Sequence, residues 1–581
     1  MQDAMNWLAR DPDPRTREEL QHLIDKGMLS ELEDRFAQRL EFGTAGLRGK
    51  VGCGPNRMNR LVIQETATGL GHYLIEHVAN ATMRGVVIGY DGRLDSKQFA
   101  TDTAAVLTAL GIRVYLTSDV AATPIVAFGV EHFNAAAAVV VTASHNPPEY
   151  NGFKVYWENG AQIIPPHDVG IATEITRAST KPIPLLSLSD AEKQGSLVWL
   201  TEGYYQTYRA AINQSPYVNN GINSTNTTLS DNATLNYNTV ISYTAMHGVG
   251  AKMAEDLLHD AGFHKVFSVA EQRDPDGHFP TVHFPNPEEK GAMDLVIDLA
   301  RHVDADIACA NDPDADRFAV AVKTEDAQYK MLTGDQVGVL FAHYLLSKPH
   351  TKNQLVGNSI VSSTLLKKVA QSHGATYYQT LTGFKWLANV GMQLENEQSE
   401  FLFAYEEALG YTIGTQVRDK DGLSAIVVFA LLVEELKSQG RTVWDLLAQI
   451  SLQHGIHTNA QRSLTIAPDS PSIGTQLRAA HPKAINGISV SEIEDLQSRL
   501  RFISGGRTEA INLPASDVLI YHLEDGSRII VRPSGTEPKV KVYYETVTEF
   551  TEPETYEDAR LRADQYMDKL IEQHQKALNG S

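Results

Sequence analysis

The chain has 581 residues, of which 42% are hydrophobic, and it carries 50 Lys and Arg against 71 Asp and Glu, a formal net charge of −21. This length exceeds what one hydrophobic core supports, so we expect several domains, and the acidic balance argues against general nucleic-acid binding. Two cysteines, Cys53 and Cys309, are too few for a disulfide framework or a cysteine-rich zinc site.

The N-terminal residues 1–40 favour helix, because apolar residues such as Leu20, Leu23 and Phe36 recur at helical spacing. No basic segment followed by an apolar stretch marks a signal peptide here. No apolar run reaches the roughly 20 residues of a membrane span. We therefore expect a cytoplasmic protein that does not bind membranes.

A glycine-rich loop, EFGTAGLRGKVGCG, comes next and carries Arg48. Such a loop brings backbone N–H groups close to an anion, and arginine can bind phosphate through two N–H groups. Flexible loops of this composition are common, so the loop alone does not define a site.

Three stretches repeat one order of elements: strand, polar loop, helix, glycine, strand. They begin at Gly85–Arg93, Thr239–Gly250 and Gln354–Ser363, and their helices end before Gly111, Gly262 and Gly374. Glycine after a helix is an ordinary stop signal. The repeat predicts three similar α/β domains whose strands pair mostly in parallel.

Within the first repeat, VVVTASHNPPEYNGFKVY (Val139–Tyr156) reads as a buried strand that ends in a stiff polar loop. A strand that ends in this way presents reactive groups at the carboxyl edge of an α/β sheet. Ser144 stands where strand gives way to loop, with His145 and Lys154 close in sequence. Ser144 is therefore a candidate nucleophile or phosphate carrier, although a capping serine in a turn fits the same triplet.

Within the second repeat, NDPDADR places Asp312, Asp314 and Asp316 in alternation after an apolar strand. Alternating carboxylates on an extended segment lie on one side, where they repel unless a cation separates them, and hard oxygen ligands suit Mg²⁺. A calcium EF-hand is rejected because its sixth and twelfth positions hold Arg317 and Lys323. A solvated acidic turn is the alternative.

From about Gln461 the strands become shorter and more alternating, Asp525-Gly526 forms a hairpin turn, and Tyr556–Leu578 reads as a long helix. This predicts a fourth, α+β domain. Its loop RPSGTEPK (Arg532–Lys539) offers a guanidinium, hydroxyls and backbone donors that suit a phosphate dianion. An ordinary turn fits the composition of this loop equally well.

Taken together, TAGLRG, TASHNPPEYNGFKVY, NDPDADR, TGFKWL, YEEALG and RPSGTEPK resemble the motifs of the α-D-phosphohexomutase superfamily, the phosphoglucomutase/phosphomannomutase family. The length, with DPDADR and FAYEEALGY, is similar to the long branch that includes phosphopentomutase-like members. The resemblance implies an α/β fold of three similar mixed α/β domains plus a C-terminal α+β domain around a central cleft. We place the domains at 1–205 (active serine loop), 206–325 (metal-binding loop), 326–455 (sugar-binding loop) and 456–581 (phosphate-binding loop).

The resemblance also implies roles for individual residues. Catalytic roles fall to Ser144, His145, Lys154 and Arg48, with the proton carrier open between His145 and Lys154. A phosphoserine oxygen at Ser144 would hold Mg²⁺ together with Asp312, Asp314 and Asp316. The implied substrate-binding residues are Arg317, Gly383, Lys385, Glu406, Arg532, Ser534, Gly535 and Thr536.

The chain departs from the family pattern at two positions: Pro313 replaces a frequent glycine, and Ala408 replaces the serine after the sugar-binding glutamates. One hydroxyl contact to the sugar is thereby lost, which leaves the choice between hexoses and pentoses open.

The implied activity is that of a phosphosugar mutase that interconverts sugar 1-phosphate and sugar 6-phosphate, through a phosphoserine enzyme and a sugar bisphosphate. Glucose is the first expected sugar and mannose the second. The alternatives are a phosphopentomutase, acting between 1- and 5-phosphates, and a metal-dependent sugar phosphatase. The expected cofactors are Mg²⁺ and a hexose 1,6-bisphosphate as activator and intermediate. The expected partners are small sugar phosphates, without nucleic acid or membrane, and the chain is expected to be a monomer or dimer.

Overall fold

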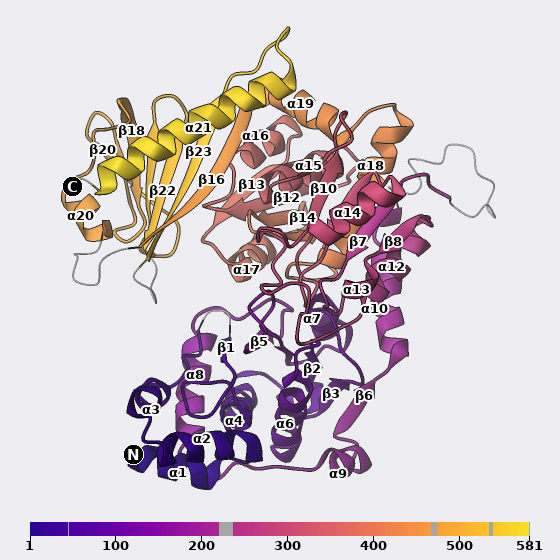
Figure 1. Cartoon of the computed structure of the whole chain (residues 1–581), viewed down its shortest axis with the longest axis vertical. Coiled ribbons are helices and arrows are strands. Elements are labelled where there is room, and N and C mark those ends of the chain that lie inside the picture. Colours follow the sequence, from indigo (N-terminus) through magenta and orange to yellow (C-terminus); the bar gives the residue numbers. More distant parts are fainter. Residues whose placement is uncertain (44–45, 220–235, 466–472, 534–538, 580–581) are drawn as a thin grey trace. The chain divides into compact units, whose positions relative to one another are not determined.

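The computed structural model describes residues 1–43, 46–219, 236–465, 473–533 and 539–579 (Figure 1). These residues divide into two compact units. Unit 1 comprises Met1–Leu332 and Ala408–Gln439, and unit 2 comprises Thr333–Glu407 and Gly440–Ser581. Each unit is described by itself.

The first part of unit 1 is built on a mixed sheet in the order β1-β5-β4-β2-β3-β6. Strands β4, β2, β3 and β6 pair in parallel, whereas β5 runs antiparallel to β4 and β1. The strands are β1 (Leu47–Lys50), β2 (Val86–Tyr90), β3 (Val114–Thr117), β4 (Ala137–Val141), β5 (Tyr150–Trp157) and β6 (Leu197–Leu200). Every residue of β2 and β4 is buried, as their continuous apolar sequences require of parallel strands covered on both faces.

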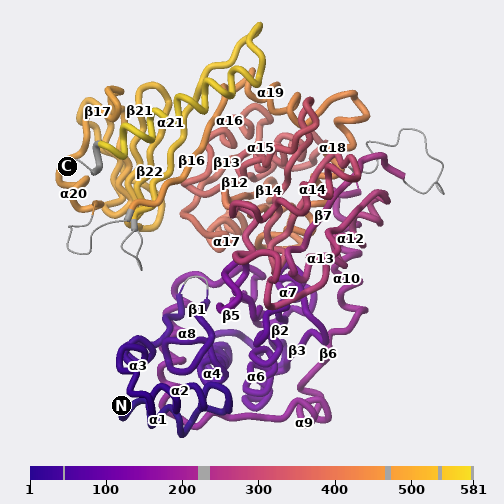
Figure 2. Tube along the Cα trace, viewed as in Figure 1, coloured from indigo at the N-terminus to yellow at the C-terminus, as the bar shows by residue number. Residues whose placement is uncertain are grey.

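Helices cover this sheet. Helix α4 packs against α6 and α8, and Figure 2 shows the three side by side. The helices are α1 (Gln2–Arg10), α2 (Pro14–Asp25), α3 (Leu29–Phe36), α4 (Arg60–His77), α5 (Ala81–Arg84), α6 (Ser96–Ala109), α7 (Thr123–His132), α8 (His167–Ala178), α9 (Leu188–Lys193) and α10 (Glu202–Gln214). The predicted N-terminal helical segment is therefore three short helices, and their apolar side chains join the core of this sheet.

The second part of unit 1 has the strand order β11-β10-β9-β7-β8, with β9, β7 and β8 parallel. Its strands are β7 (Ile241–Thr244), β8 (Val266–Ser268), β9 (Ile307–Ala310), β10 (Ala319–Lys323) and β11 (Tyr329–Met331). Strand β15 (Gly410–Ile413) also belongs to unit 1 but is not part of this sheet. Its helices are α12 (Ala251–Asp260), α13 (Ala270–Arg273), α14 (Asp294–Val303) and α18 (Gly422–Ser438). Helix α18 packs against α12 and is buried nearly all round, which explains its unbroken apolar sequence.

Unit 2 begins with a parallel ladder in the order β13-β12-β14. The strands are β12 (Asn353–Ser359), β13 (Thr376–Thr380) and β14 (Ser399–Glu406). The helices are α15 (Gly334–Leu346), α16 (Leu365–Ser372), α17 (Phe384–Leu394) and α19 (Val443–His454). Capping boxes at Thr333 and Thr442 start α15 and α19.

The rest of unit 2 is an antiparallel sheet in the order β16-β23-β22-β21-β18-β19-β20, with β17 beside β18. The strands are β16 (Ile456–Thr465), β17 (Ala484–Ile485), β18 (Ile488–Asp495), β19 (Leu500–Ile503), β20 (Arg507–Ala510), β21 (Leu519–Leu523), β22 (Arg528–Pro533) and β23 (Lys539–Thr548). Helix α20 (Ile473–Ala479) contacts β22, and α21 (Tyr556–Asn579) lies along β16 and β23 on one face (Figure 1).

The predicted repeat is present. Its three helices are α6, α12 and α16, and the glycines that follow, Gly111, Gly262 and Gly374, all have the positive φ that favours glycine at this position. The predicted hairpin at Asp525-Gly526 joins β21 to β22. The fold class, mixed α/β domains followed by a C-terminal α+β domain, is confirmed. The domain boundaries at 205, 325 and 455 stay predictions.

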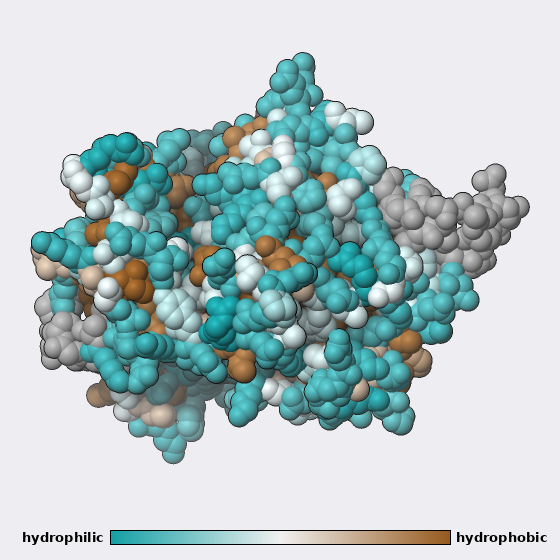
Figure 3. All heavy atoms as spheres, turned by 90° about the horizontal axis from the view of Figure 1, so that it is seen from above, coloured by the Kyte–Doolittle hydropathy of each residue, from teal (hydrophilic) through white to brown (hydrophobic). Residues whose placement is uncertain are grey.

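Among the described residues, none of the helices combines the length and hydropathy that a bilayer crossing requires. The face of the molecule drawn in Figure 3 is mostly hydrophilic, and its hydrophobic residues lie in small separate groups. A face of this kind lacks the broad apolar patch that marks many interaction surfaces.

The buried carboxyl of Asp335 should make the free energy of unfolding depend on pH. Burial raises the pKa of this carboxyl from 3.8 to about 7, although Ser363 N–H and Tyr405 Oη–H donate to it at 2.6 and 2.8 Å. Because the folded pKa exceeds the unfolded one, the folded state holds an extra proton between about pH 4 and 7. The associated stabilisation, at most about 4 kcal/mol, is complete below pH 4 and is lost as pH rises through 7.

We therefore expect Asp335→Asn to lose less thermal stability than the native protein between about pH 5 and 8, because its amide does not ionise. The apparent unfolding midpoint, measured by circular dichroism at both pH values, checks this. Asp326→Asn, at an exposed carboxylate, is the control and should behave like the native protein. Equal losses for Asp335→Asn and the native protein would contradict the expectation.

Candidate active site

Ser144 lies in the loop that follows β4 and is 3% exposed. Its φ of 52° is in the left-handed region, which a residue other than glycine adopts only where surrounding contacts hold it. One such contact is the Ser144 N–H, which donates to Thr142 Oγ1 at 2.8 Å. The hydroxyl is thus presented from a buried and strained turn.

Arg93 holds this loop from the side of β2. The guanidinium is buried and its Nε lies 3.2 Å from Asp91 Oδ2. It donates to the main-chain carbonyl oxygens of Ser144, Asn146, Pro147 and Tyr150 at 2.6 to 3.0 Å. These hydrogen bonds fix the path of the serine loop, so Arg93 acts on the loop backbone.

The aspartate loop after β9 meets the serine loop. Ser144 Oγ donates to Asp312 Oδ2 at 2.9 Å, although the two residues are 168 positions apart in the chain. Thr123, at the start of α7, donates its hydroxyl to Asp314 Oδ2 at 2.6 Å. The three aspartates are at most 1% exposed. Two loops from different sheets of unit 1 therefore form one buried site.

Basic side chains surround the carboxylates. Lys154 Nζ, from β5, lies 2.6 Å from Asp314 Oδ2 and 2.9 Å from Asp316 Oδ2. Lys420 Nζ lies 3.4 Å from Asp316 Oδ2. Arg48 Nη1 donates to Asn146 Oδ1 in the serine loop at 3.1 Å. This cluster gives an acidic chain a local site for an anion.

The carboxylates differ in acidity because their neighbours differ. Burial, and then the charges of Asp314 and Asp316, raise the pKa of Asp312 well above its ordinary value. Burial acts in the same direction on Asp314, but Lys154 and a hydrogen bond from Thr123 lower the pKa of Asp314 below its ordinary value. Burial and the Asp314 charge also act to raise the pKa of Asp316, but Lys154, Lys420 and Arg317 together lower it. The site thus stores like-charge repulsion that its basic residues offset only in part.

Burial and neighbouring charges also set the pKa values of the basic groups. Burial, with Arg317 and Arg48 nearby, lowers the pKa of His145 well below its ordinary value. Burial also acts to lower the pKa of Lys154, but the facing carboxylates raise it above its ordinary value. His145 Nδ1 lies 3.2 Å from Ser144 Oγ. The residue beside the hydroxyl is therefore a neutral imidazole near pH 7.

The aspartates fit a divalent cation. One carboxylate oxygen from each of Asp312, Asp314 and Asp316 lies within 4.8 Å of the others. Within the part of the chain that the structure describes, buried Asp314 Oδ1 and Asp316 Oδ1 have no hydrogen-bond partner. Unpartnered buried carboxylate oxygens are costly, and a cation would satisfy both. Three hard oxygen donors suit Mg²⁺.

In unit 2, the end of β14 meets the start of α17. Gly383, which precedes α17 and has a φ of 119°, donates its N–H to Glu406 Oε1 at 2.6 Å. Lys385, two residues on, is 5% exposed, and its Nζ lies 5.1 Å from the ring centroid of Trp386. Gly383, Lys385 and Glu406 thus gather at one end of the ladder.

Arg532 is half-buried near the end of β22, opposite Lys541 of β23. Ser534, Gly535 and Thr536, predicted to bind phosphate with Arg532, lie outside the described residues. The structure therefore places the predicted residues in three groups. Unit 1 brings together Arg48, Ser144, His145, Lys154, Asp312, Asp314, Asp316 and Arg317; unit 2 gathers Gly383, Lys385 and Glu406, and carries Arg532 on its antiparallel sheet. Their functional roles stay predictions.

Sequence reasoning missed Thr123 and Lys420. Each reaches the site from an element without a distinctive motif. The charged run VRDKDG (Val417–Gly422) between an apolar strand and an apolar helix was the available signal for Lys420. That run is anchored by Asp419, whose Oδ2 accepts the Tyr156 hydroxyl at 2.6 Å.

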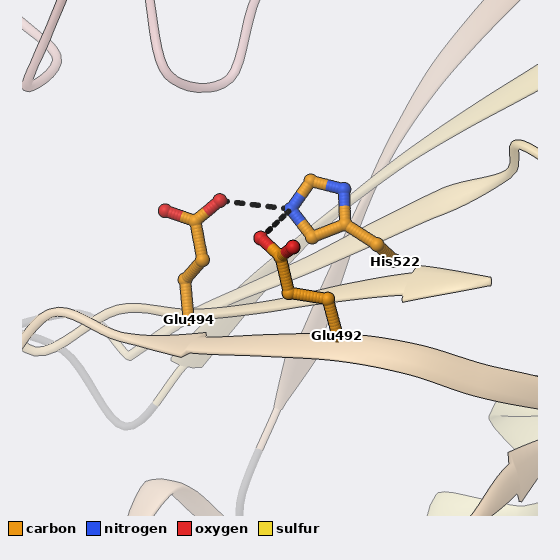
Figure 4. Close-up of side chains that lie close together, drawn as sticks. All are labelled: Glu492, Glu494 and His522. Carbon is orange, nitrogen blue, oxygen red and sulfur yellow. Dashed lines mark hydrogen bonds and ion pairs between the residues drawn. The ribbon is translucent and has the colours of Figure 1, made fainter. Parts of the chain in front are cut away.

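A second cluster of possible ligands lies in unit 2. Figure 4 shows Glu492 and Glu494 of β18 beside His522 of β21, with His522 Nε2 at 3.9 and 2.9 Å from their carboxylate oxygens. Arg501 Nε lies 2.9 Å from Glu492 Oε1. The guanidinium and imidazole already pair with these carboxylates, so the cluster is an ion-pair network on a strand surface.

Comparison with known proteins finds one family along most of the chain. Its descriptions are phosphoglucomutase/phosphomannomutase alpha/beta/alpha domain I for residues 39–182, domain II for 215–325, domain III for 333–452, and C-terminal domain for 480–558.

Individual relatives match over most of their length. The chain is 35% identical over 555 residues to a "Probable phosphoribomutase" of Schizosaccharomyces pombe, covering 92% of each chain. It is 39% identical over 496 residues to a "Probable phosphomannomutase" of Haemophilus influenzae, covering 84% of this chain and 92% of the relative. The crystal structure of a Paramecium phosphoglucomutase in its open form has a TM-score of 0.66 at 19% identity, covering 92% and 95% of the two chains. That last likeness concerns the fold alone.

The aspartate cluster predicts where a divalent cation binds. We expect the native protein to bind Mn²⁺, a paramagnetic substitute for Mg²⁺, and Asp316→Asn to weaken this binding at least about tenfold, because one carboxylate ligand is lost. Electron paramagnetic resonance of free Mn²⁺ measures the affinity without turnover. Glu492→Gln, in the cluster of Figure 4, is the control and should bind like the native protein. Undiminished binding by Asp316→Asn would place the cation elsewhere.

Proposed function

Because the chain belongs to the phosphoglucomutase/phosphomannomutase family of phosphosugar mutases, we propose that it interconverts glucose 1-phosphate and glucose 6-phosphate, with mannose phosphates as its next substrates. The observation that carries the mechanism is the 2.9 Å contact between Ser144 Oγ and Asp312 Oδ2. This contact places the hydroxyl of Ser144, the candidate phosphate carrier, beside the carboxylates that fit a cation.

The reaction has two half-reactions. In the first, the bond between phosphorus and Ser144 Oγ breaks, a bond forms between this phosphorus and a free hydroxyl oxygen of the sugar monophosphate, and the proton of that hydroxyl passes to Ser144 Oγ. The product is a sugar bisphosphate, which turns around. In the second, the phosphoryl group at the other end returns to Ser144 Oγ and leaves the isomeric monophosphate. The enzyme ends as it began, phosphorylated on Ser144.

The chain's own residues would orient this transfer and balance its charge. Phosphoryl transfer depends on in-line positioning and on neutralising the equatorial oxygens. Arg93 fixes the serine loop through its carbonyls, while Arg48, Lys154 and Arg317 supply positive charge around it. A Mg²⁺ ion held by Asp312, Asp314 and Asp316 would supply a fixed positive charge beside the phosphoryl group.

We assign the proton exchange at Ser144 to His145. His145 Nδ1 lies 3.2 Å from Ser144 Oγ, within reach of a proton. Lys154 Nζ is instead held by two carboxylate oxygens at 2.6 and 2.9 Å. Lys154 would therefore keep the aspartate loop and the serine loop in register.

The remaining groups would hold the sugar. Glu406 can accept hydrogen bonds from sugar hydroxyls, and the Gly383 N–H orients its carboxylate. Lys385 would add a positive charge next to it. We assign Arg532, with Ser534, Gly535 and Thr536, to the phosphate that is not reacting, so that the span between the two phosphate sites selects the length of the sugar.

A phosphopentomutase is the second candidate. The Schizosaccharomyces pombe relative that matches over 92% of both chains is named for ribose, and Ala408 removes a hydroxyl expected in a hexose site. A metal-dependent phosphatase, in which water accepts the phosphoryl group, is the third. The groups assigned to a second phosphate, Arg532 among them, favour a mutase over a phosphatase. Location in the cytoplasm, activation by hexose 1,6-bisphosphate, and a monomer or dimer stay predictions.

We expect Ser144→Ala to lower mutase turnover at least about a thousandfold, because no other group replaces the nucleophile. Turnover is measured with glucose, mannose and ribose 1-phosphates in the presence of Mg²⁺ and catalytic glucose 1,6-bisphosphate. Calorimetry should show that the variant still binds sugar phosphate. Ser187→Ala, at an exposed serine of the same unit, should keep native rates.

Each outcome decides between the candidates. Near-native turnover by Ser144→Ala would remove the phosphoserine mechanism. Release of inorganic phosphate from glucose 1-phosphate without glucose 6-phosphate would favour the phosphatase. A higher kcat/KM for ribose 1-phosphate than for glucose 1-phosphate would favour the phosphopentomutase.

A further inference from the structure

The antiparallel sheet of unit 2 packs on both faces. One face packs against α21 through Tyr521, Ile529 and Tyr544. On the other face Ile520, Ile530 and Tyr543 pack against Ile360 and Val361, which follow β12. The segment Ile360–Thr364, termed here the serine bridge, therefore lies against the second face of this sheet.

A row of charged side chains crosses that second face. The strand register places Glu492 opposite His522, His522 opposite Arg528, and Arg528 opposite Glu545. Residues directly opposite one another in a sheet share a face. Figure 4 shows the more exposed end of this row, at Glu492 and His522. The other end, Arg528 and Glu545, is buried, with side chains 5% and 2% exposed.

The buried pair holds the serine bridge. Arg528 Nη2 lies 2.8 Å from Glu545 Oε2, and the guanidinium donates to the carbonyl oxygens of Ile360 and Ser362 at 2.9 and 2.6 Å. Glu545 Oε1 accepts from Ser363 Oγ at 2.7 Å. Two charged groups of the sheet thus bind Ile360, Ser362 and Ser363 of the bridge.

His457 of β16 completes the pair. Its Nδ1 lies 2.9 Å from Glu545 Oε1, and its Nε2 lies 3.1 Å from Lys368 Nζ. The ammonium must donate to Nε2, so Nδ1 carries the proton that goes to Glu545. Burial acts to raise the pKa of Glu545, but Arg528 and His457 together lower it below its ordinary value. Glu545 is therefore a charged carboxylate at neutral pH.

The serine bridge also contacts Glu407, the residue that follows β14. Ser362 Oγ lies 3.0 Å from Glu407 Oε2 and accepts the Glu407 N–H at 3.1 Å. Ser359 Oγ, just before the bridge, donates to Glu407 Oε2 at 3.2 Å. Glu407 follows Glu406 directly, so the bridge fixes the backbone from which the proposed sugar-binding carboxylate projects.

The same strand that carries Arg528 carries Arg532, four residues on and on the same face. A displacement of β22 against the serine bridge would move Arg532 relative to Glu406. We propose that Arg528 and Glu545 are positioning residues, which hold the phosphate-binding Arg532 and the sugar-binding Glu406 in register through the serine bridge. This inference rests on the proposed function.

Loss of the register between Arg532 and Glu406 should weaken substrate binding more than it slows phosphoryl transfer. The reacting groups belong to unit 1, whereas Arg532 and Glu406 would bind parts of the substrate that do not react. Interactions of this kind contribute equally to the ground and transition states, so their loss raises KM and leaves kcat unchanged. We expect Glu545→Gln to raise KM at least about tenfold and to change kcat less than about twofold.

The experiment compares Glu545→Gln, Ser363→Ala and their double variant with the native protein. Ser363→Ala removes two hydrogen bonds, the one to Glu545 Oε1 and the one that the Ser363 hydroxyl accepts from the Leu365 N–H, but it keeps the buried ion pair, so we expect it to fold. Because Ser363 would act through Glu545, the double variant should have the KM of Glu545→Gln rather than the product of the two increases. Glu492→Gln, the same change at the exposed end of the row, is the matched control and should keep native KM and kcat.

Calorimetry with glucose 6-phosphate and ribose 5-phosphate gives dissociation constants without turnover, and thermal unfolding checks each fold. Weaker binding by folded Glu545→Gln and Ser363→Ala, with native binding by Glu492→Gln, is the expected result. Native KM and dissociation constants in folded Ser363→Ala and Glu545→Gln, or a loss of kcat alone, would overturn the positioning role. Absence of mutase turnover in the native protein would instead count against the proposed function.

Discussion

The site depends on the burial of three carboxylates within one short loop. Asp312, Asp314 and Asp316 are at most 1% exposed, so water does not screen their mutual repulsion. The fold compensates by bringing groups from the first part of unit 1: the ammonium of Lys154, the hydroxyl of Thr123 and the hydroxyl of Ser144. The contacts that stabilise the buried carboxylates therefore also place Ser144 beside them.

Both units pair a buried carboxylate with a basic side chain. In unit 1, a carboxylate cluster on one sheet is paired with a lysine from another. In unit 2, buried Glu545 is paired with Arg528 and accepts hydrogen bonds from the serine bridge, which belongs to a different sheet. Removing either partner would leave an uncompensated buried charge, a change that typically costs about 3–5 kcal/mol. Such pairs make the relative position of two sheets specific, and in the proposed mechanism they hold the groups that bind opposite ends of one substrate.

Short sequence patterns were sufficient to predict the elements and motifs that are contiguous in the chain. The strand–loop–helix–glycine repeat predicted α6, α12 and α16 and the strands beside them, because each unit carries its own apolar period and stop signal. Ser144 and the aspartates could be named because each lies in a contiguous motif. Lys420 and Thr123 could not, because their role arises only when distant elements meet. Glu545 reads in KVKVYYETV as an ordinary solvent-facing position of an alternating strand, yet a second layer buries it. Contiguous motifs do not determine which sugar is preferred either, because that preference depends on distances among loops.

The proposed mechanism requires that the phosphoryl group reside on Ser144 during turnover. The direct measurement is mass spectrometry of the protein after incubation with glucose 1,6-bisphosphate and Mg²⁺, followed by addition of glucose 1-phosphate. We expect a phosphate on the peptide that contains Ser144, and its transfer to the added sugar. Rapid mutase turnover with no phosphate on Ser144 at any stage would contradict it.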